Sequence, residues 1–219
     1  MIAKELISNL VLPLEPSDTL AQALTIMSIY HVKHLPVVRE EILMGILSED
    51  NATTNSPETL VRDIQISSTY TFVNINDHVF EVLARLAQNK MTVVPVVDND
   101  EKFIGIITQE DLIKYYANSF SFKEPGSIIV VESSKRGYSF SEIARVIELE
   151  NGSVLASFIT DIPNTEVVLI TIKINQQEIS SIISALERYD YKINASFTED
   201  EYDDDLKDRY DQLMNYLNV

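Results

Sequence analysis

Apolar residues recur at helical spacing in two stretches of the chain that lie 59 residues apart. Each stretch follows the i, i+3, i+4, i+7 pattern of one buried helix face. The two stripes are Leu20, Ala23, Leu24 and Met27, and Val79, Val82, Leu83 and Leu86. Asp18 and Asp77 stand just before them, where a carboxylate can accept hydrogen bonds from free backbone N–H groups. The pattern predicts two helices, each capped by its aspartate.

A matching apolar strand follows each predicted helix. Residues 32–38 read Val-Lys-His-Leu-Pro-Val-Val, and residues 91–97 read Met-Thr-Val-Val-Pro-Val-Val. Further on, Gly45-Ile-Leu-Ser48 corresponds to Gly105-Ile-Ile-Thr108 at an offset of 60, so the turn between the two strands differs by one residue. Turns are where repeats tolerate such differences. The chain therefore contains an internal repeat, and each copy is predicted as strand, helix, strand, strand, helix.

A second, smaller domain is predicted after Tyr116, where the repeat ends. Four apolar strands and two amphipathic helices alternate there as β-α-β-β-α-β, the split arrangement of ferredoxin-like domains. We therefore expect an α/β (α+β) protein with five segments. These are a first repeat at 1–58, a second repeat at 59–117, a linker at 118–126, the ferredoxin-like domain at 127–197 and an acidic C-terminal helix at 198–219.

Composition and charge narrow the class of protein. With 219 residues, 45% of them hydrophobic, the chain can bury a core. Its 34 acidic and 17 basic residues give a net charge of −17, which argues against binding to nucleic acid or to an anionic membrane surface. No apolar run reaches the roughly 18 residues that a membrane span needs. The N-terminal sequence lacks the order of a signal peptide, so we expect a cytoplasmic protein.

The last 22 residues carry much of this negative charge, with eight acidic and two basic side chains. Behind the acidic run, four apolar residues recur at helical spacing. They are Leu206, Tyr210, Leu213 and Leu217. Two interpretations of this amphipathic helix stay open: it docks on its own domain, or it binds a partner protein.

Catalytic motifs are absent from the sequence. There is no cysteine, which excludes disulfides, thiolate catalysis and cysteine-ligated metals. There is also no G-x-S-x-G, P-loop, dinucleotide-binding or H-E-x-x-H motif. His31 and His34 lie across a helix end and a strand start, so we expect no metal ion between them. These observations predict a protein that is not an enzyme and that requires neither a cofactor nor a metal.

The repeat resembles a CBS-domain pair over about residues 1–117, because both copies read apolar-Pro-Val-Val and then Gly-Ile-(Leu/Ile)-(Ser/Thr)-x-x-(Asp/Asn). Residues 126–197 resemble an ACT domain in element order, in Arg136-Gly137 at the first turn and in Gly152 before the second strand. This CBS-CBS-ACT layout is similar to the AcuB-type proteins associated with acetoin utilisation. The resemblance implies a Bateman-type module, a homodimer and a regulatory ligand that contains adenosine.

The resemblance also implies a better ligand site around Asp111. Its carboxylate would accept two hydrogen bonds from a ribose diol, since an ionised carboxylate offers only acceptor oxygens. Thr108 would donate its hydroxyl to a phosphate or ribose oxygen, and Lys33 and His34 would supply positive charge. The expected lining is Asp111, Thr108, Glu110, Val32, Lys33, His34 and Asp18. Asp111 has a simpler alternative role, which is to cap the helix beginning at Leu112.

A weaker site is expected at the companion motif, where Asn51 replaces the ribose aspartate and offers an acceptor without charge. Its expected lining is Ser48, Asp50, Asn51, Met91, Thr92 and Val93. The candidate ligands are AMP, ADP, ATP and S-adenosylmethionine. Because the carboxylates of Glu110 and Asp50 would repel phosphates, AMP, adenosine or a sulfonium-bearing adenosine is favoured over ATP.

Arg136 and Gly137 are candidates for a metabolite site in the ACT-like domain, although a plain chain turn is the favoured interpretation. The expected function is that of a regulatory sensor. An adenosine-containing ligand binds in the CBS cleft, and the ACT-like domain relays this to a protein partner that the sequence does not identify. The alternative is a dimeric protein-interaction scaffold whose ligand sites are degenerate.

Overall fold

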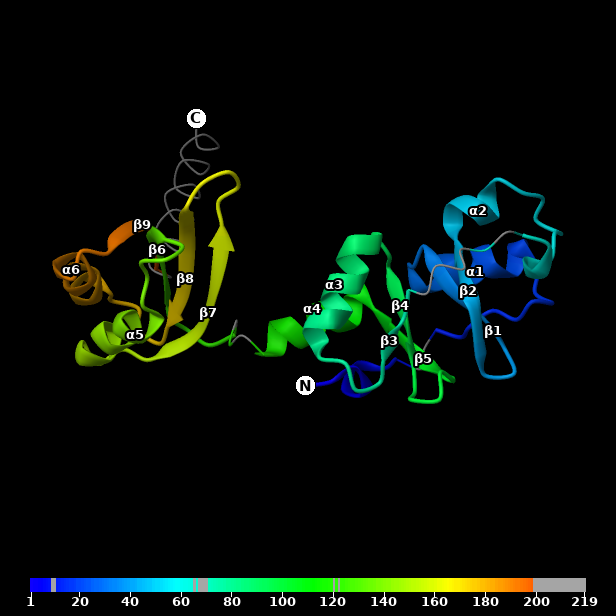
Figure 1. Ribbon diagram of the computed structural model, residues 1–219, viewed down its shortest axis with the longest axis horizontal. Coiled ribbons are helices and arrows are strands. Elements are labelled where there is room, and N and C mark those ends of the chain that lie inside the picture. Colours follow the sequence, from blue (N-terminus) through cyan, green and yellow to red (C-terminus); the bar gives the residue numbers. More distant parts are fainter. Residues whose placement is uncertain (9–10, 65, 67–70, 120, 122, 199–219) are drawn as a thin grey trace, which may run out of the picture. The chain divides into compact units, whose positions relative to one another are not determined.

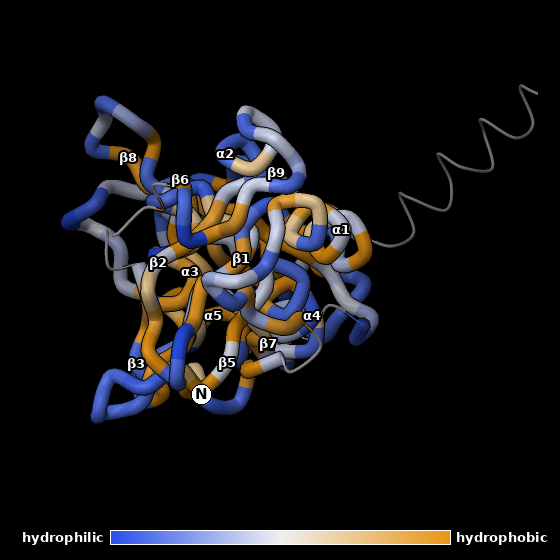
Figure 2. Tube along the Cα trace, turned by 90° about the vertical axis from the view of Figure 1, so that its right-hand side faces the viewer, coloured by the Kyte–Doolittle hydropathy of each residue, from blue (hydrophilic) through white to orange (hydrophobic). Residues whose placement is uncertain are grey.

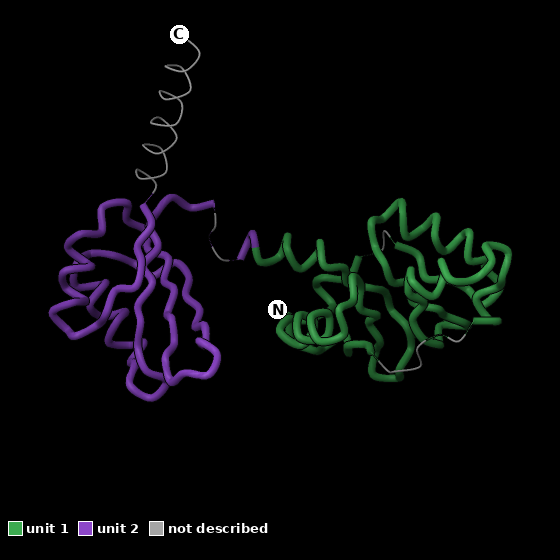
Figure 3. The backbone as a smooth tube through the Cα atoms, turned by 90° about the horizontal axis from the view of Figure 1, so that it is seen from above, with its two compact units in different colours: residues 1–116 green, residues 117–219 purple. Residues whose placement is uncertain are grey.

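The computed structural model describes residues 1–8, 11–64, 66, 71–119, 121 and 123–198. The chain divides into two compact units, residues 1–116 and 117–219 (Figure 3). Hydrophobic residues gather along the strands, whereas the turns are mostly hydrophilic (Figure 2). The predicted C-terminal helix lies outside the described residues.

The first unit contains the repeat. Its elements are η1 (Ala3–Leu6), α1 (Leu20–Tyr30), β1 (His34–Arg39), β2 (Ile42–Ser48), α2 (Glu49–Thr53), η2 (Val61–Asp63), β3 (Val73–Asn74), α3 (Val79–Asn89), β4 (Val93–Val97), β5 (Phe103–Thr108) and α4 (Gln109–Ser119), where η marks a 3-10 helix (Figure 1). The predicted order of strand, helix, strand, strand and helix is confirmed in the second copy, where β3 precedes α3. In the first copy the helix, two strands and helix are confirmed, but the expected first strand is reduced to an isolated bridge between Leu14 and Val37. Helix α4 continues to Ser119, so the beginning of the expected linker is helical.

The two copies share one strand register. Strand β1 pairs antiparallel with β2, placing Pro36 opposite Ile46, and β4 pairs antiparallel with β5, placing Pro95 opposite Ile106. A bulge occurs at the same point in each hairpin, after the valine that follows the proline. Proline cannot donate to a strand ladder, so its equivalent position in both hairpins is a structural signature of the repeat.

The helix caps differ from the expected ones. Thr19, not Asp18, is the N-cap of α1 and forms a capping box with Gln22. His78, not Asp77, is the N-cap of α3. Each aspartate instead fixes the preceding turn. Asp18 Oδ2 accepts from the backbone N of the residue three positions earlier at 2.7 Å, and Asp77 Oδ2 does the same at 2.8 Å. A carboxylate at such a position can accept from backbone N–H groups of the following helix or of the preceding turn. Here both aspartates accept from the preceding turn.

Each repeat is completed by a segment from outside its expected boundaries. Ala3 N donates to Asp77 O at 2.8 Å, which attaches the N-terminal segment to the second repeat. Val61 N donates to Asp18 O at 2.9 Å, which attaches the start of the second repeat to the first repeat. These two contacts are equivalent in the repeat. Through these contacts, the two repeats form one folded unit.

The hydrophobic cores show the same exchange. Val93 and Ile106 belong to the second repeat in sequence but pack in the core of the first. Ile46 comes from the first repeat and packs in the core of the second. All three side chains are buried. The two repeats therefore share apolar contacts across their seam, where hydrophobic burial stabilises both.

The second unit has the predicted β-α-β-β-α-β order. Its elements are β6 (Ser127–Ser134), α5 (Phe140–Leu149), β7 (Val154–Asp161), β8 (Val167–Ile174), α6 (Ser180–Arg188) and β9 (Lys192–Phe197). The strands form an antiparallel sheet in the order β7-β8-β6-β9. Alternate residues of β6 and β8 are buried in one core with the apolar faces of α5 and α6. The ferredoxin-like arrangement is confirmed.

Two glycines of this unit provide a matched stability test. A Cβ at Gly126 would lie 2.0 Å from the carbonyl oxygen of Ile174, which is backbone and cannot rotate away. A Cβ at Gly137 would lie 2.4 Å from Ser134 Oγ, the end of a side chain that can rotate. We predict that Gly126→Ala lowers the free energy of unfolding by about 1–3 kcal/mol or more, as overpacked sites do, and that Gly137→Ala costs clearly less.

Chemical denaturation of both variants, followed by circular dichroism, checks this prediction. Equal losses of stability in the two variants would contradict the close approach of Gly126 to β8.

Candidate functional site

The first unit contains a cavity between the two repeats, which we call the first cavity. Its volume is about 120 Å³. The residues come from the end of α1, the start of β4 and the first turns of α4, together with the chain before α1. They are Ser8, Val11, Tyr30, His31, Val32, Thr92, Thr108, Gln109, Glu110, Asp111 and Lys114. Of the residues expected at the better site, Val32, Thr108, Glu110 and Asp111 lie here.

Asp111 and Thr108 bond reciprocally in this cavity. Asp111 Oδ2 accepts from Thr108 N at 2.9 Å and from Thr108 Oγ1 at 2.6 Å. Thr108 Oγ1 in turn accepts from Asp111 N at 3.1 Å. The pair thus forms a capping box at the start of α4, which begins at Gln109 rather than at Leu112. The bonds that the carboxylate accepts in the described chain all reach Oδ2, so Oδ1 keeps its acceptor capacity.

Glu110 and Lys114 form an ion pair in the lining of the first cavity. Lys114 Nζ lies 2.7 Å from Glu110 Oε1, one helical turn away on α4. The hydrogen bond from Lys114 lowers the pKa of the Glu110 carboxyl, and the same bond raises the pKa of Lys114. Both side chains are exposed. The cavity lining therefore contains a lysine that the sequence analysis missed, although the i, i+4 spacing from Glu110 could have indicated it.

A second cavity opens at the companion motif, with a volume of about 210 Å³. Its lining is His34, Ile46, Ser48, Asn51, Thr71, Asn89 and Met91. Ser48, Asn51 and Met91 were expected there. Asn89 occupies in the second repeat the position of Tyr30 in the first, an offset of 59, so equivalent positions line the two cavities, and neither residue was expected from the sequence.

The structure groups several expected site residues differently. His34 lines the second cavity, not the first. Thr92 lines the first cavity, not the second. Lys33 Nζ lies 3.5 Å from Glu49 Oε2, on the side of the first repeat's own motif. Lys33 and His34 are consecutive residues at the start of β1. Their side chains lie on different sides because successive side chains of an extended chain point to opposite faces.

Three further expected residues line neither cavity. Asp18 fixes the turn before α1. Val93 is fully buried in the core of the first repeat. Asp50 is an exposed residue of α2, and its backbone oxygen accepts from Thr53 Oγ1 at 3.1 Å.

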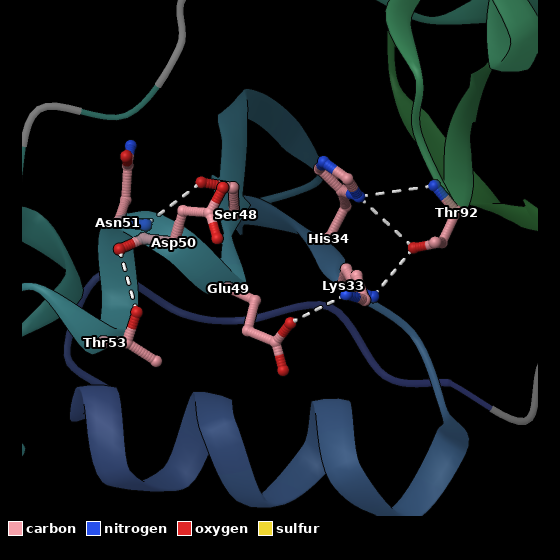
Figure 4. A network of polar contacts seen from close by, with 8 residues as sticks. All are labelled: Lys33, His34, Ser48, Glu49, Asp50, Asn51, Thr53 and Thr92. Carbon is pink, nitrogen blue, oxygen red and sulfur yellow. Dashed lines mark hydrogen bonds and ion pairs between the residues drawn. The ribbon is translucent and has the colours of Figure 1, made fainter.

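The motifs in the two repeats differ at one position, which is Asp111 in the second repeat and Asn51 in the first. Ser48 Oγ accepts from Asn51 N at 3.2 Å, as Thr108 does from Asp111 N. The carboxamide of Asn51 points away from Ser48 (Figure 4), whereas the Asp111 carboxylate bonds back to Thr108. The negative acceptor is therefore present only in the first cavity of the described chain.

His34 connects the two repeats. Thr92 N donates to His34 Nδ1 at 3.3 Å, and Thr92 Oγ1 lies 3.3 Å from the same nitrogen (Figure 4). Burial lowers the pKa of His34, with smaller opposing effects from Asp50 and Glu49. The ring therefore favours its neutral form, in which Nδ1 can accept.

In the ACT-like domain, Arg136 is exposed and Gly137 lies in the turn after β6, where Gly137 N donates to Ser134 O at 3.2 Å. This geometry is that of a chain turn. In the described part of the chain, no three His, Cys, Asp or Glu residues are grouped so as to hold a metal ion. Among the same residues, no helix is both long and apolar enough to cross a membrane.

A model of the CBS domain family matches residues 3–55 and 61–118, which together make up about half of the chain. The chain belongs to the CBS-domain family. Both matched segments end close to the two motifs that line the cavities.

Among curated proteins, the CBS chain is similar to inosine-5'-monophosphate dehydrogenase from Methanocaldococcus jannaschii. The two are 27% identical over 155 residues, which cover 68% of this chain and 30% of that enzyme. The chain also spans 21% of the inosine-5'-monophosphate dehydrogenase from Thermoplasma acidophilum and 36% of an uncharacterised protein from Methanocaldococcus jannaschii, so it covers well under two thirds of each of these three relatives.

Among solved structures, a CBS domain pair/ACT domain protein from Thermotoga maritima superposes with a TM-score of 0.50 at 20% identity, covering 55% of this chain and all of that chain. A Vibrio cholerae protein assigned to acetoin utilisation (AcuB) gives a TM-score of 0.49 at 21% identity, covering 57% and 96%. The predicted resemblance to a CBS pair with an ACT-like domain is confirmed.

The capping role of Asp111 leads to a stability prediction. Asp111→Ala removes the acceptor for Thr108 N and should lower the free energy of unfolding by about 1 kcal/mol, the usual cost of losing a helix cap. Asp111→Asn keeps an acceptor oxygen and should lose less. Urea denaturation of the two variants measures the difference. An alanine variant as stable as the parent chain would show that the capping box contributes nothing.

Proposed function

We propose that this CBS chain is a non-enzymatic regulatory protein that binds an adenosine-containing ligand in its first cavity. The observation that carries the proposal is the Asp111 carboxylate, held in the cavity by Thr108 with Oδ1 available. A carboxylate fixed through one oxygen can accept from a ribose diol through the other without losing its cap. The capping and ligand-binding roles of Asp111 are thus compatible.

The Glu110–Lys114 pair bears on the charge of the ligand. Thr108 Oγ1 already donates to Asp111, so its proton is engaged, and Lys114 is the group best suited to a phosphate. A phosphate on Lys114 would compete with Glu110, and several phosphates would meet the repulsion of its carboxylate. A single phosphate, or a cationic group that pairs with Glu110, fits this lining better than a triphosphate. AMP, adenosine and S-adenosylmethionine are therefore the favoured candidates.

Binding would act by population shift, since a ligand held by both repeats favours the arrangement in which Thr92 and Asp111 face the same cavity. We propose that the ACT-like domain relays this change to a protein partner, and that the chain works as a homodimer in the cytoplasm. Exposed apolar side chains on the helices of the first unit, among them Ile29, Phe80 and Ile113, support self-association.

A protein-interaction scaffold is the second candidate. The first cavity, at about 120 Å³, is smaller than the roughly 300–1,000 Å³ of common ligand pockets. In this interpretation Asp111 only caps α4. Both candidates predict a homodimer, which a single 24.8 kDa species in light scattering would contradict.

Thermal unfolding with adenosine, AMP, ADP, ATP, NAD and S-adenosylmethionine tests the proposal. A ligand at a hundred times its dissociation constant should add about 2.7 kcal/mol to the free energy of unfolding. We expect this for at least one adenosine compound, and we expect Asp111→Asn, which keeps the cap acceptor, to abolish it. Stabilisation by none of the compounds would contradict ligand binding and favour the scaffold.

Ligand charge gives a second test. Glu110→Gln should strengthen AMP binding several-fold relative to adenosine, because it releases Lys114 and removes a repelling carboxylate. The same variant should weaken S-adenosylmethionine relative to adenosine, since the sulfonium loses its counter-charge. Lys114→Gln is the matched control and should weaken AMP alone. Titration calorimetry measures the three affinities, and unchanged ratios in both variants would place the charged groups of the ligand elsewhere.

A further inference from the structure

We propose that His34 couples the two cavities, so that a change in the bonding of its ring in the second cavity alters ligand affinity in the first. The inference rests on the proposed function, because it concerns the regulation of the same binding site. It adds a role for the second cavity, whose motif lacks the ribose aspartate.

The contact that carries this inference joins residues 58 positions apart in the chain. His34 lines the second cavity and Thr92 lines the first. Thr92 N donates to His34 Nδ1 at 3.3 Å, and Thr92 Oγ1 accepts from Lys33 N at 2.8 Å. One threonine of the first cavity is therefore held in place by two consecutive residues of the other repeat (Figure 4).

The chemistry of the imidazole makes this contact switchable. A backbone N–H can only donate, so Nδ1 must be the acceptor and the neutral ring carries its hydrogen on Nε2. This second nitrogen points away from Thr92 (Figure 4). A proton added to the ring would occupy Nδ1, and Thr92 N would lose its acceptor, which is costly for a partly buried amide.

Few charged groups lie near His34. The charged groups that face it are Asp50 and Glu49 on α2 and the neighbouring Lys33. The other residues that line the second cavity have no side chain that ionises near neutral pH. The side chains of the first cavity's described lining that can carry a charge are Tyr30, His31, Glu110, Asp111 and Lys114.

The repeat provides an internal comparison. The counterpart of His34 in the second repeat is Val93, which is fully buried and has no polar side-chain atom. The counterpart of Thr92 is Lys33, which lies on the surface. The equivalent contact therefore cannot form in the opposite direction. The His34–Thr92 bond is specific to one side of the pseudosymmetric pair.

Thermodynamic reciprocity supplies the test. If protonation of His34 changes the affinity of the first cavity, then a ligand there must change the acid dissociation constant of His34 by the same factor. The experiment is an NMR pH titration of the histidine rings in the full chain, with and without saturating adenosine, which does not itself ionise between pH 5 and 8. His31→Asn and His78→Asn variants assign the three ring signals.

Because protonation removes the acceptor that holds Thr92 in the first cavity, bound adenosine should favour the neutral ring. We therefore expect adenosine to raise the acid dissociation constant of His34 by roughly fivefold or more, the lower end of typical allosteric couplings. We expect Thr92→Val to reduce this change. If calorimetry shows that adenosine binds while His34 titrates unchanged, the coupling is overturned and the proposed function stands. If neither adenosine nor any other adenosine compound binds at any pH, it is the proposed function that fails.

Asp111→Asn controls for direct occupancy of the second cavity. This variant should lose the effect of adenosine on His34, because binding in the first cavity is lost. An undiminished effect in Asp111→Asn would mean that adenosine touches His34 directly, and it would overturn coupling between the cavities.

Discussion

The seam between the two CBS repeats is the constraint on which the first unit depends. Each repeat is completed by a segment and by core side chains from outside its expected boundaries, with Val93 and Ile106 packed in the first core and Ile46 in the second. Because a well-packed core resists small displacements, the seam fixes the relative position of the two motifs. Both cavities lie along this seam, and neither could form in a repeat folded alone.

Pseudosymmetry gives the chain two similar cavities with different chemistry. The first combines the carboxylate of Asp111 with the cation of Lys114. The second contains His34 and two carboxamides, one of them Asn51, and has no permanently charged group in its described lining. A charged nucleotide is suited to the first, whereas a proton or an uncharged group is suited to the second. This difference in chemistry fits the proposed roles, in which the first cavity binds the ligand and the second modulates its affinity.

Much of the fold could be predicted because it rests on periodic apolar residues, which specify helices and strands locally. The repeat and the β-α-β-β-α-β domain follow from such patterns. The helix caps could not, since Asp18 can bond to a turn as well as to a helix. The motif likewise indicated Thr108 and Asp111, but the side of the seam reached by His34 depends on where β1 begins, and that is fixed by tertiary packing. Lys114 could have been predicted from its i, i+4 spacing to Glu110 on a helix.

We propose that the Asp111 carboxylate holds a ribose in the first cavity while it caps α4. A crystal structure of the full chain grown with adenosine tests this most directly. We predict electron density for the nucleoside between the repeats, with its ribose diol within hydrogen-bond distance of Asp111 Oδ1 and the bonds from Thr108 to Oδ2 intact. Adenosine bound elsewhere on the chain, or a first cavity filled only by water at saturating adenosine, would contradict the account.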